Sequence, residues 1–438
     1  MTLNFVSSAL EYLKIIEEFL WSYIGFSIIC IIGLYLTFVS KGFQFKILGQ
    51  FRSTMKDLLE ESKKNKVGIN PIKLFFTSTG GSVGMGNIVG IGIAIMLGGL
   101  GSIFWMWIAS FFGMLIKYSE IYLSIKYRVL NDKGSYNGGL MYYCKMAFKS
   151  KLLAYIVAIL LCFYGAEIYL FLVMVDRIDQ AINLDRWIII AILLTAVMYS
   201  VFGGLKRVSN ICAVMMPVFI FGYLGICLYI IISNYDSLPS IFIQIITTAF
   251  TGQAKIGGFV GSTWLLSAYL GMSKAVYSGD IGIGYDSVVQ SESKVVDPKK
   301  QAKFSIYALF TDTLVCFMTS LVIAVTGAWY KLNHLSPSDV ISHILSEYFF
   351  LAEETMTVLF FTAGFTTVVA FLLVGIKSAE FINKKLGKYI YLFYSAVVFI
   401  IFSYLDQGNV ITFMSIAGGL LIVLNIIAII KLRKEIEF

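Results

Sequence analysis

Long apolar stretches separated by short polar segments run along almost the whole chain. A membrane-spanning helix needs about 20 predominantly apolar residues. By this measure the sequence predicts eleven spans, at about residues 20–40, 72–99, 100–125, 152–175, 186–203, 208–233, 258–291, 303–330, 355–380, 388–405 and 409–430. Segments 240–250 and 336–350 are apolar but too short to span, so they are predicted to lie as helices at the membrane interface. The pattern therefore predicts an all-α, multi-pass membrane protein.

Composition agrees with this pattern and excludes several classes of function. Of the 438 residues, 58% are hydrophobic and only 14% are charged, whereas soluble proteins carry about 25% charged residues. No Pro-rich or Gly/Ser-rich linker divides the chain, so residues 1–438 are predicted to form one transmembrane domain. There is no HExxH motif, no Walker loop and no nucleophile elbow. We therefore expect no enzyme, no cofactor and no nucleic-acid partner.

The net charge is +8, and the positions of the basic residues along the chain are its informative feature. Lysine and arginine gather in alternate loops, at residues 41–73, 128–151, 206–207, 294–303, 384–388 and 431–434. The loops between these hold few basic residues. Because cytoplasmic loops carry the excess of basic residues, we predict an external N-terminus and a cytoplasmic C-terminus. This orientation requires an odd number of spans, and the expected location is a bacterial inner membrane.

Two of the predicted spans contain unusual concentrations of glycine. The first is "FFTSTGGSVGMGNIVGIGIAIMLGG" at residues 75–99, and the second is "SGDIGIG" at residues 278–284. Each glycine inside a helix costs roughly 1 kcal/mol relative to alanine. Unwound backbone is tolerated inside a membrane bundle only where it is buried in protein or lines a cavity. The sequence therefore predicts two interrupted helices.

The positions of these interruptions suggest a repeat. If helix 20–40 is an addition, the other ten spans form two sets of five, at residues 71–234 and 240–431, and each set begins with an interrupted helix. Paired interruptions in two oppositely oriented halves indicate a transporter site near the middle of the bilayer. For Gly98, Gly99 and Gly113, close helix packing remains an equal alternative.

Several motifs resemble those of the alanine or glycine:cation symporter family. They include "GNIVGIG", "GGLGSIFWMW", "GMLIKYSE", "KYR" and "GGLMYY", then "GGLKR" at 203–207, "FTDTLVCFMTSL" at 310–321 and "GFTT" at 364–367. Leu100 and Leu140 stand where that family usually has proline. The resemblance covers about residues 70–414 and implies the five-plus-five inverted repeat of the amino acid–polyamine–organocation superfamily. It also implies sodium-coupled uptake of alanine, glycine or a similar amino acid.

The two interruptions supply candidate groups for a zwitterionic amino acid. Free amides near Gly84, Met85 and Gly86, at the positive end of a half-helix, suit a carboxylate. The predicted substrate-binding residues are Ser82, Gly84, Met85, Gly86, Asn87, Ser278, Gly279, Asp280 and Phe371. Asp280 has three predicted roles: it binds the substrate ammonium, takes a proton or holds the two interruptions together.

The resemblance also implies a sodium site. Sodium favours hard oxygen ligands, and the site implied comprises Gly80, Val83, Thr366 and Thr367. The alternative is that these threonines only bond back to carbonyls of their own helix.

Other ionisable residues within spans are candidates for function or for helix pairing. Asp312 and Glu167 fit either role. Lys117 and Glu120 are three residues apart, so an ion pair between them or partial snorkelling toward the interface explains both.

The chain departs from the family pattern mainly at residues expected to face the substrate. Segments 165–171, 285–287 and 373–376 differ, and Phe371 replaces a tryptophan. We therefore predict that the scaffold and the sodium ion persist while substrate choice has drifted toward a larger or more apolar amino acid. The alternatives are proton coupling through Asp280 or Glu167, and a membrane binding protein without transport activity. The sequence makes no prediction of oligomeric state.

Overall fold

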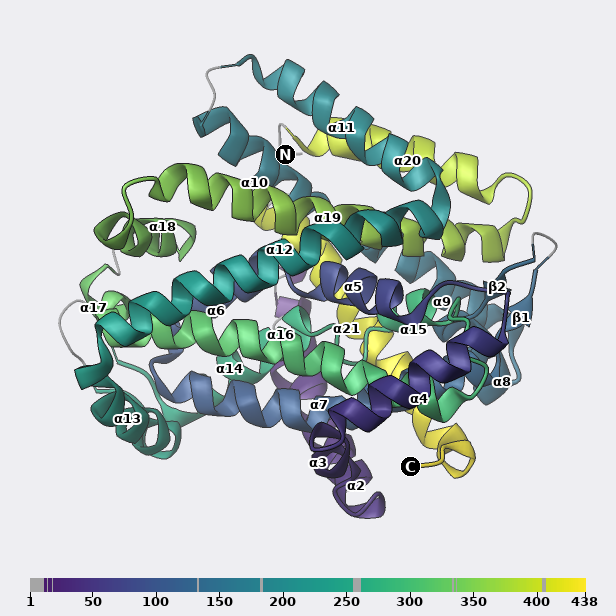
Figure 1. The fold of residues 1–438 in the computed structure, drawn as a ribbon, viewed down its shortest axis with the longest axis horizontal. Coiled ribbons are helices and arrows are strands. Elements are labelled where there is room, and N and C mark those ends of the chain that lie inside the picture. The colour runs from purple at the N-terminus through teal and green to yellow at the C-terminus, as the bar shows by residue number, and fades with distance from the viewer. Residues whose placement is uncertain are drawn as a thin grey trace.

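The structure is a computed structural model, and it describes residues 12–13, 15–17, 19–131, 134–181, 184–254, 261–332, 335, 337–403 and 407–438. Nearly all described residues are helical (Figure 1). One short antiparallel pair of strands, β1 (Val129–Leu130) and β2 (Tyr136–Asn137), closes a loop.

The helices follow the predicted order along the chain. They are η1 (Leu20–Gly25), α2 (Phe26–Val39), α3 (Phe43–Leu48), α4 (Phe51–Lys64), α5 (Pro71–Ser82), η2 (Met85–Asn87), α6 (Val89–Gly98), α7 (Gly101–Lys126), α8 (Leu140–Phe148), α9 (Lys151–Tyr164), α10 (Ile168–Ala181), α11 (Arg186–Phe202), α12 (Gly204–Ser233), η3 (Tyr235–Ser237), α13 (Leu238–Thr251), α14 (Trp264–Ser278), α15 (Tyr285–Gln290), α16 (Pro298–Thr326), α17 (Ala328–Lys331), α18 (Pro337–Tyr348), α19 (Ala352–Ile382), α20 (Gly387–Phe402), α21 (Gln407–Leu432) and η4 (Arg433–Glu435). Helices lie in all eleven predicted ranges, and α13 and α18 lie in the two predicted interfacial segments.

Six helices of the described residues are long and apolar enough to cross a membrane, and the bent pair α5 with η2–α6 adds a seventh. Three further apolar helices, within α2, α11 and α20, are shorter than this criterion requires. A multi-pass helical membrane protein is therefore confirmed, whereas the number eleven and the repeat remain predictions.

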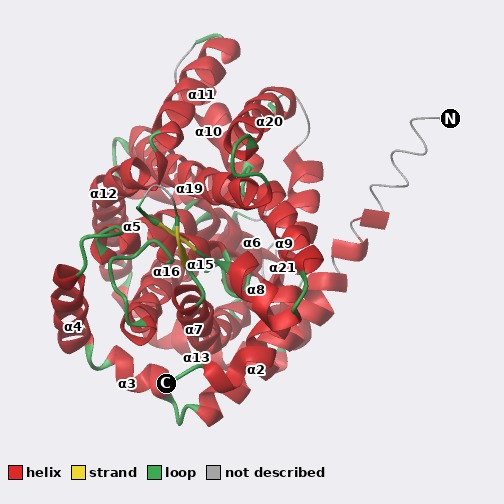
Figure 2. Cartoon of the chain, turned by 90° about the vertical axis from the view of Figure 1, so that its right-hand side faces the viewer, coloured by secondary structure: helices red, strands yellow, loops and turns green. Residues whose placement is uncertain are grey.

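The long helices lie side by side and are seen nearly end-on in Figure 2. Helix α7 packs against α14 and α16, and α19 packs against α9, α10 and α12. Helix α19 is almost wholly enclosed, while α12 exposes large apolar side chains such as Val218 and Phe221. A helix that is apolar on all sides belongs inside a bundle or against lipid, so α19 forms part of the core and α12 part of the apolar exterior.

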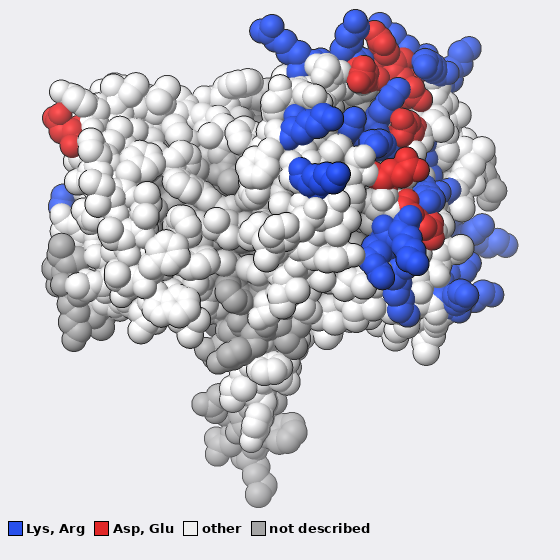
Figure 3. Space-filling model, turned by 90° about the horizontal axis from the view of Figure 1, so that it is seen from below, with Lys and Arg blue, Asp and Glu red and all other residues white. Residues whose placement is uncertain are grey.

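Charged side chains gather at one end of the molecule, and a broad uncharged belt separates them from the few at the other end (Figure 3). Helix α4 lies at the charged end and was not predicted, because residues 51–64 were interpreted as a polar loop. It is amphipathic, and its Glu61 pairs with Lys300 of α16 at 3.1 Å. The predicted basic loops thus gather at one end, and which side of the membrane that end faces remains a prediction.

Both predicted interruptions are present. Helix α5 ends at Ser82 and the chain bends by 56° into η2 and α6. Helix α14 ends at Ser278 and α15 begins at Tyr285, with Asp280 at a φ of 50° between them.

A third interruption, which was not predicted, divides the span at 152–175. Helix α9 ends at Tyr164, α10 begins at Ile168, and Glu167 has a φ of 44°. A Cβ on Gly165 would lie only 2.8 Å from the Phe371 carbonyl oxygen of α19. The close approach of α19, which the local sequence does not reveal, explains why this stretch requires glycine.

Candidate functional site

The first interruption exposes backbone rather than charge. Gly84 has an extended backbone, and the first amide to bond within η2 is that of Asn87, which donates to the Gly84 carbonyl at 3.2 Å. The amides of Met85 and Gly86 precede this bond, so they are the unsatisfied donors of a helix start. A Cβ on Gly86 would meet nothing within 4 Å. The space beside Gly86 is therefore open, and it adjoins the start of η2.

The amide of Gly84 is not free, contrary to the prediction. It donates to Asn87 Oδ1 at 2.8 Å. Asn87 Nδ2 in turn donates to Asp312 Oδ1 at 2.6 Å, and Asn87 is fully buried. Asn87 thus caps the interruption and connects it to α16, and both ends of its amide group are occupied by protein.

Asp312 joins the two interruptions. Its Oδ1 accepts from Asn87, and its Oδ2 accepts from the Ser278 hydroxyl at 3.4 Å, at the end of α14. Of the two roles predicted for Asp312, the contacts support pairing between helices.

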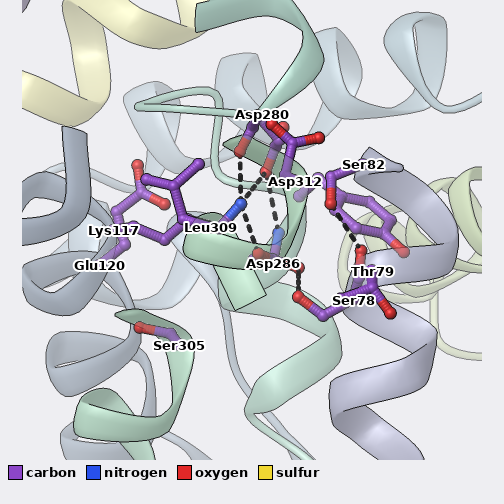
Figure 4. A network of polar contacts seen from close by, with 12 residues as sticks. Ser78, Thr79, Ser82, Lys117, Glu120, Asp280, Asp286, Ser305, Leu309 and Asp312 are labelled. Carbon is purple, nitrogen blue, oxygen red and sulfur yellow. Dashed lines mark hydrogen bonds and ion pairs between the residues drawn. The ribbon is translucent and has the colours of Figure 1, made fainter. Parts of the chain in front are cut away.

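Lys117 holds the second interruption in place (Figure 4). Its Nζ donates to the Gly279 carbonyl at 2.5 Å and lies 2.5 Å from Asp286 Oδ2 and 4.0 Å from Asp280 Oδ2. The side chain is 1% exposed. A buried ammonium is tolerated only when it is paired and hydrogen-bonded. Lys117 therefore neither snorkels nor forms the predicted pair with Glu120.

Glu120 belongs to a neighbouring set of contacts. Its Oε1 accepts from Asn425 Nδ2 at 2.6 Å, and Asn425 Oδ1 accepts from the Tyr143 hydroxyl at 2.6 Å. Asn425 Nδ2 also donates to the Gly282 carbonyl at 2.8 Å. These contacts connect α21 and α8 to the unwound segment after α14.

Residues 285–287, where the chain departs from the family pattern, include two side chains that contact α5. Ser78 donates a short hydrogen bond to Asp286 Oδ1, and the Tyr285 hydroxyl donates to the Thr77 carbonyl at 3.0 Å. A Cβ on Gly81 would lie 2.2 Å from the Tyr285 hydroxyl oxygen. These contacts hold α5 against α15. Tyr285 and Asp286 were not predicted as site residues, although the buried charge at the departure from the family pattern was a usable signal.

A cavity of about 40 Å³ lies between the interruptions. It is lined by Gly81, Ser82, Gly84, Gly86, Tyr164, Glu167, Tyr169, Leu170, Tyr277, Ser278, Asp280, Thr367 and Phe371. Six of the nine predicted substrate residues are among these, while Met85, Asn87 and Gly279 are not. One water needs at least about 10–15 Å³ of such space, so binding an amino acid requires the cavity walls to move.

The two threonines proposed for sodium face different neighbours. The Thr367 hydroxyl lies 2.9 Å from the carbonyl oxygens of Gly80 and Ala363, and a Cβ on Gly84 would lie 2.8 Å from it. The Thr366 hydroxyl donates to the Thr362 carbonyl at 2.9 Å and lies 3.3 Å from Met216 of α12. Thr367 therefore faces the first interruption, whereas Thr366 faces α12.

Larger hollows lie on both sides of the central cavity. One of about 280 Å³ shares Gly86, Tyr169 and Tyr277 with it and is also lined by Lys274. The other, of about 1080 Å³, lies among the lysines of the charged end and is lined by Glu292, Lys377 and Leu373.

One contact of α19 lies beside the central cavity, and another lies in the wall of the larger hollow. Phe371, which lines the cavity, stacks on Tyr285 with ring centroids 4.2 Å apart. Lys377 of the same helix forms a close ion pair with Glu292, which follows α15. Both contacts join α19 to the segment after the second interruption.

Comparison with known proteins agrees with this arrangement. A sequence model of the sodium:alanine symporter family matches residues 6–437. The chain belongs to this family. It is 26% identical to the probable sodium/glutamine symporter GlnT of Bacillus subtilis over 96% of this chain and 88% of that one. It is 30% identical to the sodium/alanine symporter AgcS of Methanococcus maripaludis over 59% of this chain and 58% of that one.

Solved structures show the same transporter fold. A mutant of the Eremococcus coleocola manganese transporter matches with a TM-score of 0.56 at 16% identity, covering 85% of this chain and 77% of that one. At this identity the likeness concerns only the fold.

Proposed function

We propose that this family member is a sodium-coupled symporter that imports a small neutral amino acid, such as alanine or glycine, by alternating access. The observation that carries the proposal is a cavity that brings the start of η2, at Gly86, together with two buried carboxylates, those of Glu167 and Asp280. A membrane carrier of zwitterions needs both kinds of group, because each charge of the cargo loses its water. We propose that the sparsely charged end of the molecule is external and that the lysine-rich end is cytoplasmic.

We place sodium beside Thr367. Its hydroxyl keeps acceptor capacity after donating one hydrogen bond, and the Gly80 carbonyl is already 2.9 Å away. Carbonyl and hydroxyl oxygens are the hard ligands that such a cation favours. Val83 remains in the proposed site, whereas Thr366 contributes only if its hydroxyl turns away from α12.

Alternating access requires the contacts on either side of the cavity to open in turn. Tyr169 and Tyr277 separate the cavity from the smaller hollow, and the Phe371–Tyr285 stack lies beside the cavity. The Lys377–Glu292 ion pair closes the lysine-rich side at the same helix. We propose that these contacts break when α19 and the second interruption separate.

Proton coupling is the second candidate, and the charges around Lys117 favour it. Two carboxylates, those of Asp280 and Asp286, share one buried ammonium, and two more, those of Glu120 and Asp312, are bonded only to neutral side chains nearby. Like charges in a buried cluster favour protonation of some members. One of these carboxyl groups is then able to carry a proton.

Uptake into proteoliposomes tests the proposal. Replacing external sodium with choline at constant pH should abolish accumulation of alanine or glycine, and accumulation that follows only a pH gradient would support proton coupling instead. In Thr367→Val, the sodium concentration needed for half-maximal uptake should rise about tenfold, since one hydrogen-bonding ligand contributes about 1–1.5 kcal/mol. Thr362→Val is the matched control, because its hydroxyl only bonds to the Val358 carbonyl of the same helix.

A further inference from the structure

Glu167 differs from every other carboxylate near the cavity in its surroundings. It lies in the unpredicted interruption between α9 and α10, is 4% exposed and lines the central cavity. Within the described part of the chain, its carboxylate has no hydrogen-bond or ion-pair partner. A buried charge without a partner is costly. A positively charged ligand bound beside Glu167 would remove this cost.

The neighbouring carboxylates are already engaged. Asp280 accepts from the Asp286 amide at 3.2 Å and lies 4.0 Å from Lys117, both through Oδ2, while its Oδ1 has no hydrogen-bond partner among the described residues. Asp312 accepts from Asn87 and Ser278. Because Asp280 shares the ammonium of Lys117 with Asp286, whereas no cationic side chain lines the cavity beside Glu167, Glu167 is better placed than Asp280 to receive an ammonium group.

The backbone at Glu167 supports a functional role. Its φ of 44° is left-handed, a conformation that is strained for a non-glycine residue. Such strain persists where the surrounding structure imposes it, and it occurs often at ligand sites. At Glu167 this strained backbone lies between α9 and α10, where the side chain forms part of the cavity wall.

The rest of the cavity complements this carboxylate. No Lys, Arg or His lines it among the described residues, and Tyr164, Tyr169 and Tyr277 supply aromatic rings that attract cations. Gly86 of the first interruption lines the same cavity and leaves space for a carboxylate beside its backbone. The cavity therefore offers separate groups for the two charges of one small amino acid.

We infer that Glu167 is the specificity-determining receptor for the ammonium group of the cargo, an inference that rests on the proposed function. The cargo class is then small primary amino acids with a protonated amine. Compounds of the same shape in which a hydroxyl replaces the amine leave the buried carboxylate unpaired and are rejected.

The test compares L-alanine with L-lactate, its hydroxy analogue, as ligands of the purified full-length protein. Binding is measured by thermal shift and calorimetry at fixed sodium concentration, in wild type, Glu167→Gln and Glu167→Asp. Glu354→Gln, an exposed substitution in the first turn of α19, is the control.

Wild type and the control should bind alanine at least tenfold more tightly than lactate. Glu167→Gln should lose this discrimination while keeping its stabilisation by sodium, and Glu167→Asp should retain most of it. A structural role would weaken both ligands equally. Undiminished preference for alanine in Glu167→Gln would overturn the inference alone, whereas wild type that responds to neither alanine nor sodium would overturn the proposed function as well.

Discussion

The two predicted interruptions look alike in sequence, yet their unwound segments are satisfied in different ways. The first is formed by backbone, with open space at Gly86 and an amide cap from Asn87. The second is filled by charge, because Lys117 bonds to Gly279 and pairs with Asp286. The comparison teaches that glycine-rich unwinding does not by itself mark a ligand site. We propose that cargo binds at the first interruption, where space is open at Gly86, and that the second serves mainly to hold the helices together.

Replacing Lys117 should have the largest effect on stability. Lys117→Met leaves Asp286 and Asp280 buried without their cation, and losing one partner of a buried pair costs about 3–5 kcal/mol. Denaturant unfolding of the purified protein measures this loss. Lys56→Met, at a highly exposed position on α4, should change little. Unchanged stability in Lys117→Met would mean that the second interruption does not depend on this charge.

Replacing Asn87 tests whether the first interruption is capped by protein. Asn87→Ala removes partners from the Gly84 amide and the Asp312 carboxylate, so we expect a loss of about 2–3 kcal/mol of stability, typical of hydrogen bonds to charged groups. Asn210→Ala on α12 is the matched control and should cost much less, because its hydrogen bond from Lys73 is exposed to solvent. If Asn87→Ala kept full stability but lost amino-acid binding, the result would support the original prediction that Asn87 contacts the substrate.

Two alanine substitutions separate the packed and open parts of the first interruption. Gly81→Ala drives a methyl group into Tyr285, so stability should fall by about 1–3 kcal/mol. Gly86→Ala meets no neighbour, so its thermal unfolding should stay near that of wild type while alanine affinity falls roughly tenfold. Equal stability losses in both variants would contradict the distinction between them.

The partly exposed ion pair of Glu61 with Lys300 is the reference for the fully buried pair of Lys117. The hydrogen bond from Lys300 lowers the pKa of Glu61 below its usual value. A lowered folded pKa stabilises the protein above the unfolded pKa, about 4.3, and this stabilisation disappears as pH falls through the folded pKa. Glu61→Gln should therefore cost less than about 1 kcal/mol at neutral pH and nothing in strong acid. Unfolding measured at both pH values, at low and high salt, checks this.

Several side-chain partners lay beyond prediction. Lys117 and Glu120 are neighbours on one helix, and that spacing suggested a pair between them. The structure gives Lys117 a partner more than 160 residues away instead. Glu167 was a candidate in sequence, but the helix interruption that places it in the cavity depends on the approach of α19 to Gly165.

The sequence alone determined the membrane location, the helix order, the two glycine-rich interruptions and the family. These properties follow from local composition, because apolar length and glycine content act on each segment independently of its neighbours. Tertiary structure alone decided which charges meet, which amides remain open and which carboxylate stands unpaired in the cavity. Partners of buried groups come from helices distant in sequence, and packing selects among them because every buried polar group must be satisfied somewhere.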